Sequence, residues 1–119
     1  MAASGTRLRI KHEKDVTQVE FVDRNILDEA NIQAIGDEIT AIIDATPSPR
    51  LLISFSNVDH LSSAALGTLI SINNRMKAKK GELRLANIDP QIMEVFMITR
   101  LNRIFSIHDT TADALATFT

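Results

Sequence analysis

The chain has 119 residues, of which 45% are hydrophobic and 24% charged, which fits one globular domain with one core. It contains no cysteine, which excludes disulfides and thiolate metal sites, and its net charge of -2 provides no overall basic field for nucleic acid or an acidic membrane. No apolar run approaches the roughly 18 residues of a membrane-spanning helix, and the N-terminal MAASGTR lacks the apolar stretch of a secretory signal. We therefore expect a single cytoplasmic domain over residues 1–119, with a frayed tail at 1–6.

The N-terminal part alternates polar and apolar side chains, which is the pattern of a strand with one solvent-facing side. The alternation occurs in residues 7–11 (RLRIK) and again from Thr17 (TQVEFV), where Thr17, Val19 and Phe21 share one face. The intervening HEKD is typical of a turn. We predict an antiparallel hairpin at the edge of a sheet.

A first helix is predicted after this hairpin, because isoleucines recur at the three- and four-residue steps of one helix face. These isoleucines are Ile32, Ile35, Ile39 and Ile42. Pro47 and Pro49 are expected to end the helix. The unbroken apolar run at 51–55 (LLISF) then predicts a strand covered on both faces, as in a parallel sheet.

A second helix is predicted from Ser62 or Ser63 to about Lys79, after a loop at 56–61 (SNVDHL). Its first half is apolar, and its last turns carry basic residues that suit the negative end of the helix dipole. Gly81 is expected to stop this helix.

The rest of the chain continues the alternation of strands and helices. Residues 82–88 (ELRLANI) predict a strand, and Pro90 opens a third helix. The core-facing positions of that helix are expected to be Ile92, Val95, Phe96 and Thr99. A short strand near 106–109 (SIHD) and a final helix capped by Thr110 or Thr111 follow. This order predicts a single α/β domain with a mixed, mostly parallel sheet of about five strands packed with about four helices.

Motifs for catalysis, metals and nucleotides are missing from the sequence. His12, His60 and His108 stand in different segments and do not have ligand spacing, so we expect them on the surface or in loops. There is no G-x-S-x-G elbow, no P-loop and no G-x-G-x-x-G. Ser63, His60 and Asp59 could form a nucleophile, a base and an orienting carboxylate only across a loop. We therefore expect a protein that is not an enzyme and needs no cofactor or metal.

A serine pair at the start of the second helix is the most informative feature. One of Ser62 and Ser63 is expected to cap the helix, because a serine hydroxyl accepts a hydrogen bond from a free backbone N–H group. The second hydroxyl is then available. A phosphate on it would face unpaired N–H groups and the positive end of the helix dipole. Ala64, Ala65 and Gly67 are small, and we expect them to keep the nearby surface low enough for another protein to approach.

Four segments of the sequence together resemble the STAS domain family, typified by bacterial anti-sigma-factor antagonists. NILDEAN stands where the family enters its first helix. LLISFSNVDHLSSAALG matches an apolar strand, a loop and the family's D-S-S-G-L-G. KAKKGELRL matches a basic helix end followed by G-x-L-x-L, and MITRLNRIFSIHD matches the C-terminal L-T-G-L-x-x-L-F-x-I-x-D. The resemblance covers nearly the whole chain from about residue 7.

The resemblance implies a phosphorylation switch. Family members of this size, when unphosphorylated, bind an anti-sigma factor that is also a serine kinase. The kinase phosphorylates a serine at the start of the second helix and thereby breaks the complex, and a separate phosphatase removes the phosphate. The alternative is a STAS accessory subunit of a transport or other signalling complex without phosphorylation. A small-ligand or nucleotide-binding domain is a third interpretation.

The resemblance also implies site residues. Matching A-L-G to the family's G-L-G places Ser63 on the phosphoacceptor, whereas a shift of one residue selects Ser62. Ser62 then stands at the family's Asp, Ala64 at its second Ser and Ala65 at its first Gly, so the motif is altered. Asp28 matches a family Asp that lies close to the acceptor, although it also suits a helix start. The expected partner-binding residues are Asp28, Asp59, His60, Ser62, Ala65, Leu66 and Thr68.

Overall fold

The computed structural model describes residues 8–13, 15–22, 24–26 and 29–118. The expected tail at 1–6 and the site candidate Asp28 lie outside the described residues. The strands are β1 (Leu8–Glu13), β2 (Val16–Phe21), β3 (Asn25–Ile26), β4 (Arg50–Ser54), β5 (His60–Leu61), β6 (Glu82–Ala86) and β7 (Ser106–His108). The helices are α1 (Glu29–Asp44), α2 (Ser63–Ala78), α3 (Pro90–Ile98), the 3-10 turn η1 (Leu101–Arg103) and α4 (Thr111–Leu115).

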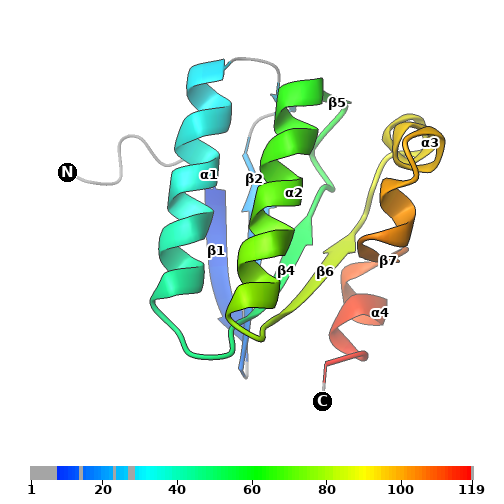
Figure 1. The fold of residues 1–119 in the computed structure, drawn as a ribbon. Coiled ribbons are helices and arrows are strands. Elements are labelled where there is room, and N and C mark those ends of the chain that lie inside the picture. The colour runs from blue at the N-terminus through cyan, green and yellow to red at the C-terminus, as the bar shows by residue number, and fades with distance from the viewer. Residues whose placement is uncertain (1–7, 14, 23, 27–28, 119) are drawn as a thin grey trace.

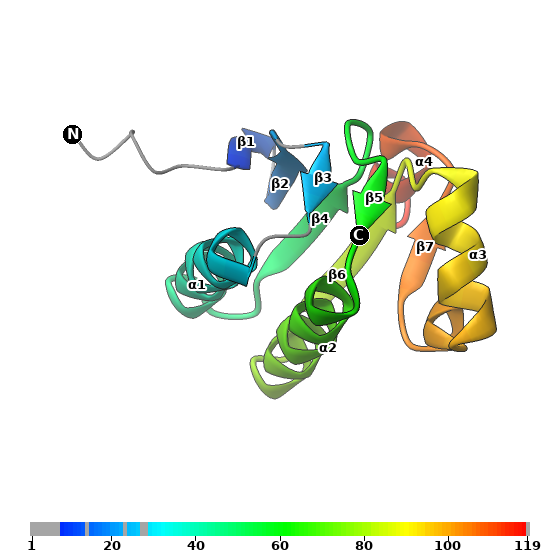
Figure 2. The same cartoon turned by 90° about the horizontal axis from the view of Figure 1, so that it is seen from above.

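The main sheet has five strands in the order β1-β2-β4-β6-β7. β1 and β2 pair antiparallel at one edge, and the remaining neighbours pair parallel. Figures 1 and 2 show α1 and α2 side by side on one face, α4 on the other face, and α3 beside β7 at the far edge. The predicted mixed sheet, its N-terminal hairpin and the four helices are therefore confirmed.

The core lies between the sheet and the α1–α2 layer. Leu51 and Ile53 on the central strand β4 are fully buried and point toward these helices. The α1 residues that meet them are Ile32, Ile35, Ile39 and Ile43. The sequence analysis expected Ile42 on this face, because Ile42 and Ile43 both continue the helical spacing. Ile42 is only partly buried, since Ile43, four residues after Ile39, faces the sheet more directly.

The prediction for the buried face of α3 was wrong at two positions. Ile92 and Phe96 are buried, but Val95 and Thr99 are exposed. Figure 2 shows α3 beside β7 at the edge of the sheet, and only Ile92 and Phe96 of this helix are buried.

Two strands were missed. Asn25–Ile26 and His60–Leu61 form the parallel pair β3–β5, although residues 56–61 had been interpreted as a loop. Two residues are too few to show any periodicity, and their pairing joins segments that are distant in the sequence. Figure 2 shows the two strands side by side, and the Ser62 amide at the start of α2 donates to the Ile26 carbonyl of β3.

The end of α2 was predicted correctly but for the wrong physical reason. Lys80, not Gly81, adopts the left-handed conformation, with φ of 58°. The amides of Lys80 and Gly81 bond back to the Lys77 and Met76 carbonyls at 3.0 and 2.8 Å, as in a Schellman motif. Glycine is needed because a Cβ at position 81 would lie 2.5 Å from the Pro49 carbonyl oxygen.

An ion pair joins the far ends of α1 and α2. The Arg75 guanidinium donates two hydrogen bonds to the Asp44 carboxylate, at 2.9 and 2.6 Å. These hydrogen bonds hold the pKa of the Asp44 carboxyl below its usual value. The stabilisation from this pair is therefore present above the ordinary carboxyl pKa and is lost only as the pH falls through the lowered one.

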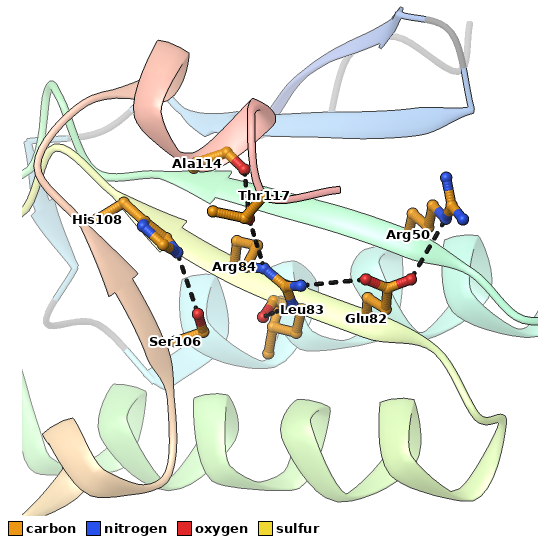
Figure 3. Close-up of polar contacts among 8 residues, drawn as sticks. All are labelled: Arg50, Glu82, Leu83, Arg84, Ser106, His108, Ala114 and Thr117. Atoms are coloured by element: carbon orange, nitrogen blue, oxygen red, sulfur yellow. Dashed lines mark hydrogen bonds and ion pairs between the residues drawn. The ribbon is translucent and has the colours of Figure 1, made fainter. Parts of the chain in front are cut away.

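Polar side chains attach the C-terminal helix to the second face of the sheet (Figure 3). The Arg84 guanidinium on β6 donates to the Thr117 hydroxyl at 2.8 Å and to Glu82 at 3.1 Å. Its carbon lies 4.8 Å from the centre of the Phe118 ring, a cation–π distance. Arg84 therefore connects the middle of the sheet to the segment after α4.

We predict opposite stability effects for alanine at two glycines. Gly81→Ala forces the new methyl group against the Pro49 carbonyl and is expected to lower the free energy of unfolding by about 1–3 kcal/mol. Gly67→Ala in α2 has open space around the new methyl group and should raise it by about 0.5–1 kcal/mol. Urea unfolding of both variants measures the difference, and equal effects would contradict the described packing.

Candidate functional site

The two serines at the start of α2 have different structural roles. Ser62 is the N-cap, with an extended backbone, and its hydroxyl accepts a hydrogen bond from the Ala65 amide at 3.2 Å. Ser63 is the first residue of the helix, and its side chain is exposed. The structure therefore assigns the predicted cap to Ser62 and places the second hydroxyl at the surface.

The segment that leads into α2 is held by backbone hydrogen bonds to the chain near β3. The amides of Asp59 and His60 donate to the Arg24 carbonyl at 2.7 and 3.2 Å, and the Ser62 amide donates to the Ile26 carbonyl at 3.1 Å. The Arg24 guanidinium also contacts the Asp59 carboxylate at 2.9 Å. These contacts hold the segment before Ser62 in place against Arg24, which stands about 35 residues earlier in the chain.

Not all of the predicted partner-binding residues lie at the surface. His60 is exposed, and Asp59, Ser62 and Thr68 are half-buried. Ala65 was expected at the surface but is 5% exposed and belongs to the core, so that expectation was wrong. As the third residue of α2, it points toward α1 instead of outward. Leu66 is also largely buried, at 9% exposure.

Small side chains near the start of α2 serve the contact between the two large helices. A Cβ at Gly36 of α1 would lie 3.0 Å from the Thr68 methyl group of α2. Thr68 and Ala65 also line the same small apolar space between α1, α2 and the sheet. The low bulk of Ala65 and Gly36 is thus explained by close helix packing, and Thr68 contributes its methyl group to this interface.

A groove of about 220 Å³ lies beside the serine pair, between β5, α2 and α3. Its lining comes from three separate parts of the sequence. The lining residues are Asp59, His60, Leu61, Leu66, Gln91, Ile92 and Val95. Asp59, His60 and Leu66 were singled out from the sequence, whereas the α3 residues were missed because only the fold brings that helix alongside β5.

The Asp59 and His108 side chains make their described contacts in different parts of the structure. The Asp59 carboxylate is held by Arg24 and contacts no histidine in any described interaction. His108 contacts the Ser106 hydroxyl at 3.1 Å, on the other face of the sheet (Figure 3). Within the described part of the chain, no three potential metal-ligating side chains gather in one place, and no helix is long and apolar enough to cross a membrane.

Comparison with known proteins identifies the family. The family model of the STAS domain matches residues 8–114. The chain therefore belongs to the STAS domain family.

Several of the similar proteins are named as anti-sigma factor antagonists. BtrV of Bordetella bronchiseptica, named as an anti-sigma factor antagonist, is 26% identical over 95 residues, which cover 80% of this chain and 81% of BtrV. The solved structure of an anti-sigma-factor antagonist (STAS) domain protein from Planctomyces limnophilus has a TM-score of 0.81 at 24% identity, covering 92% of this chain and 94% of its own. The Bacillus cell fate determinant SpoIIAA, solved in its phosphorylated form, has a TM-score of 0.68 at 16% identity, and the match covers 92% of this chain and 96% of the SpoIIAA chain.

We predict that the two serines differ in their contribution to stability. Ser62→Ala removes the acceptor of the Ala65 amide and is expected to lower the free energy of unfolding by about 0.5–2 kcal/mol. Ser63→Ala removes an exposed hydroxyl and should change it by less than about 0.5 kcal/mol. Denaturant unfolding of both variants measures this difference, and a larger loss for Ser63→Ala would show that the cap is misassigned.

Proposed function

We propose that the protein is an anti-sigma factor antagonist of the cytoplasm, controlled by phosphorylation of Ser63. In its unphosphorylated form it binds an anti-sigma factor that is also a serine kinase. Phosphorylation of Ser63 by that kinase ends the binding, and a protein phosphatase restores it. The observation that carries this proposal is the exposed Ser63 hydroxyl on the first turn of α2, next to a serine whose hydroxyl already caps the helix. The names of the relatives support the same function.

The choice of Ser63 over Ser62 follows from what each hydroxyl does. The Ser62 oxygen accepts the Ala65 amide, and its side chain is half-buried. A kinase that modified Ser62 would have to compete with the cap. Ser63 has an exposed side chain and needs no rearrangement of the helix to enter an active site.

A phosphate on Ser63 is compatible with the folded structure. It would add about −1.5 to −2 of charge at the positive end of a 16-residue helix. Charge–dipole interactions of this kind are favourable by about 0.3–1 kcal/mol. The modification is therefore expected to act on the partner, through charge repulsion and steric mismatch, while the domain stays folded.

The partner surface in this proposal surrounds Ser63. Asp59 and His60 lie in the segment before α2, where their amides bond to the Arg24 carbonyl. Leu66 lines the groove beside this segment. Asp28, which precedes α1, remains part of the proposed surface through the family resemblance. Ala65 and Thr68 support this surface from the α1–α2 interface, because their side chains pack there.

A transport or signalling accessory subunit without phosphorylation is the alternative. It is favoured by the altered motif, since Ser62 and Ala64 replace the family's Asp and second Ser. The neighbouring genes discriminate between the two functions. A sigma factor, kinase or phosphatase gene supports the switch, and transporter genes support the alternative.

We predict that a serine kinase of the anti-sigma type, encoded beside this gene, phosphorylates Ser63 in the presence of ATP. Mass spectrometry should locate one phosphate on Ser63 in the wild type and in Ser62→Ala, and none in Ser63→Ala. Ser63→Asp places a negative charge at the interface and should weaken kinase binding by about tenfold or more. Calorimetry measures that loss.

The matched control is Ser71→Asp, which adds the same charge to an exposed serine further along α2. It should bind the kinase like the wild type, and both variants should melt within a few degrees of it. A Ser63→Asp variant that binds as tightly as the wild type would refute the switch, and a phosphate found only on Ser62 would refute the assignment of the acceptor.

A further inference from the structure

Exposed apolar side chains concentrate near α3. Among the described residues six large hydrophobic side chains are exposed, and four of them lie between residues 95 and 104. These are Val95, Met97, Ile98 and Ile104, with Ile98 the most exposed at 75%. A local concentration of this kind, surrounded by polar residues, marks an interaction site on a soluble protein.

Four apolar residues of α3 lie along a side of the helix that does not face the core. Pro90, Met93, Met97 and Ile98 follow the spacing of a single helix face, and together with Glu94 they line one open hollow. We call this set of four residues the α3 stripe. Its two methionines are unbranched and flexible, so the stripe can adapt to the shape of a bound surface.

The α3 stripe is continuous with the surface around Ser63. Val95, an exposed residue of α3, lines the groove together with His60 and Leu66. Val95 precedes Ile98 of the α3 stripe by three residues in the same helix, so the two exposed side chains are neighbours on its surface. Figure 1 shows the start of α2, β5 and α3 at the same end of the molecule. A protein that covers Ser63 and the groove therefore reaches the neighbouring side of α3.

The size of the α3 stripe argues against a second copy of this chain as its occupant. α3 has nine residues, and such a helix is about 13 Å long and about 10 Å wide. A stable protein–protein interface needs about 800 Å² from each partner. The stripe alone is too small to hold two copies together, whereas a partner that also covers the groove and the start of α2 would bury a larger area.

We propose that the α3 stripe is an apolar anchor for the same anti-sigma factor that recognises Ser63, an inference that rests on the function proposed above. The partner would place large apolar side chains on Met97 and Ile98. Phosphorylation changes α2 but leaves this contact in place. Binding would thus combine a constant contact on α3 with a contact at Ser63 that depends on phosphorylation.

The test measures the affinity of the purified anti-sigma kinase for the full-length protein and its variants by calorimetry. Ile98→Glu should weaken binding by about tenfold or more, because it places a charge in an apolar contact. Ile98 is highly exposed, so this variant should melt like the wild type. The matched control is Ile10→Glu, an exposed isoleucine on β1 at the opposite edge of the sheet, which should bind like the wild type.

The double variant Ile98→Glu with Ser63→Asp separates the two contacts. Because they lie on different elements, their separate fold-losses in affinity should multiply to within about a factor of two. Wild-type affinity of Ile98→Glu, with Ser63→Asp weakened, would overturn the α3 anchor and leave the proposed function standing. Failure of the wild type to bind the kinase would overturn both. A wild-type dimer that Ile98→Glu converts to a monomer, with kinase binding unchanged, would assign the α3 stripe to a second copy and overturn the anchor.

Discussion

The hydrogen bond from the Ala65 amide to the Ser62 hydroxyl determines where α2 begins, and the candidate site depends on that start. With Ser62 as the cap, Ser63 becomes the first helical residue and points to solvent, while Ala65 and Leu66 turn toward the core. If Ser63 were the cap instead, its hydroxyl would accept a helix amide and would no longer be the available one. This one hydrogen bond thus gives Ser62 a structural role and leaves the Ser63 hydroxyl available for modification.

The rest of the fold supports this helix start from outside α2. β3 and β5 tie the approach to Ser62 to the chain that follows β2, through the carbonyls of Arg24 and Ile26. The close contact between Gly36 and Thr68 fixes α2 against α1. Because the site is held by both its backbone and its buried face, a charge added at Ser63 can alter the outer surface without loosening the packed layers.

The sequence predicted those features that repeat along the chain. Isoleucines at helical spacing, the apolar run of β4 and the glycine and proline positions were sufficient for the order of the four helices and the five strands of the main sheet. Contacts that join distant segments could not be predicted. The two-residue strands β3 and β5 lack any periodicity, and the exposure of Val95 depends on the edge position of α3. For the same reason the serine pair was found from the sequence, whereas the groove between β5 and α3 was not.

The central claim is that phosphorylation changes the surface at the start of α2 and leaves the fold intact. Two-dimensional ¹H–¹⁵N NMR spectra of the kinase-treated and untreated protein test it most directly. We expect amide shifts confined to residues around Ser63 and the adjoining groove, with the signals of β4 and β6 unchanged. Widespread shifts across the sheet, or a spectrum unchanged near Ser63, would contradict this account.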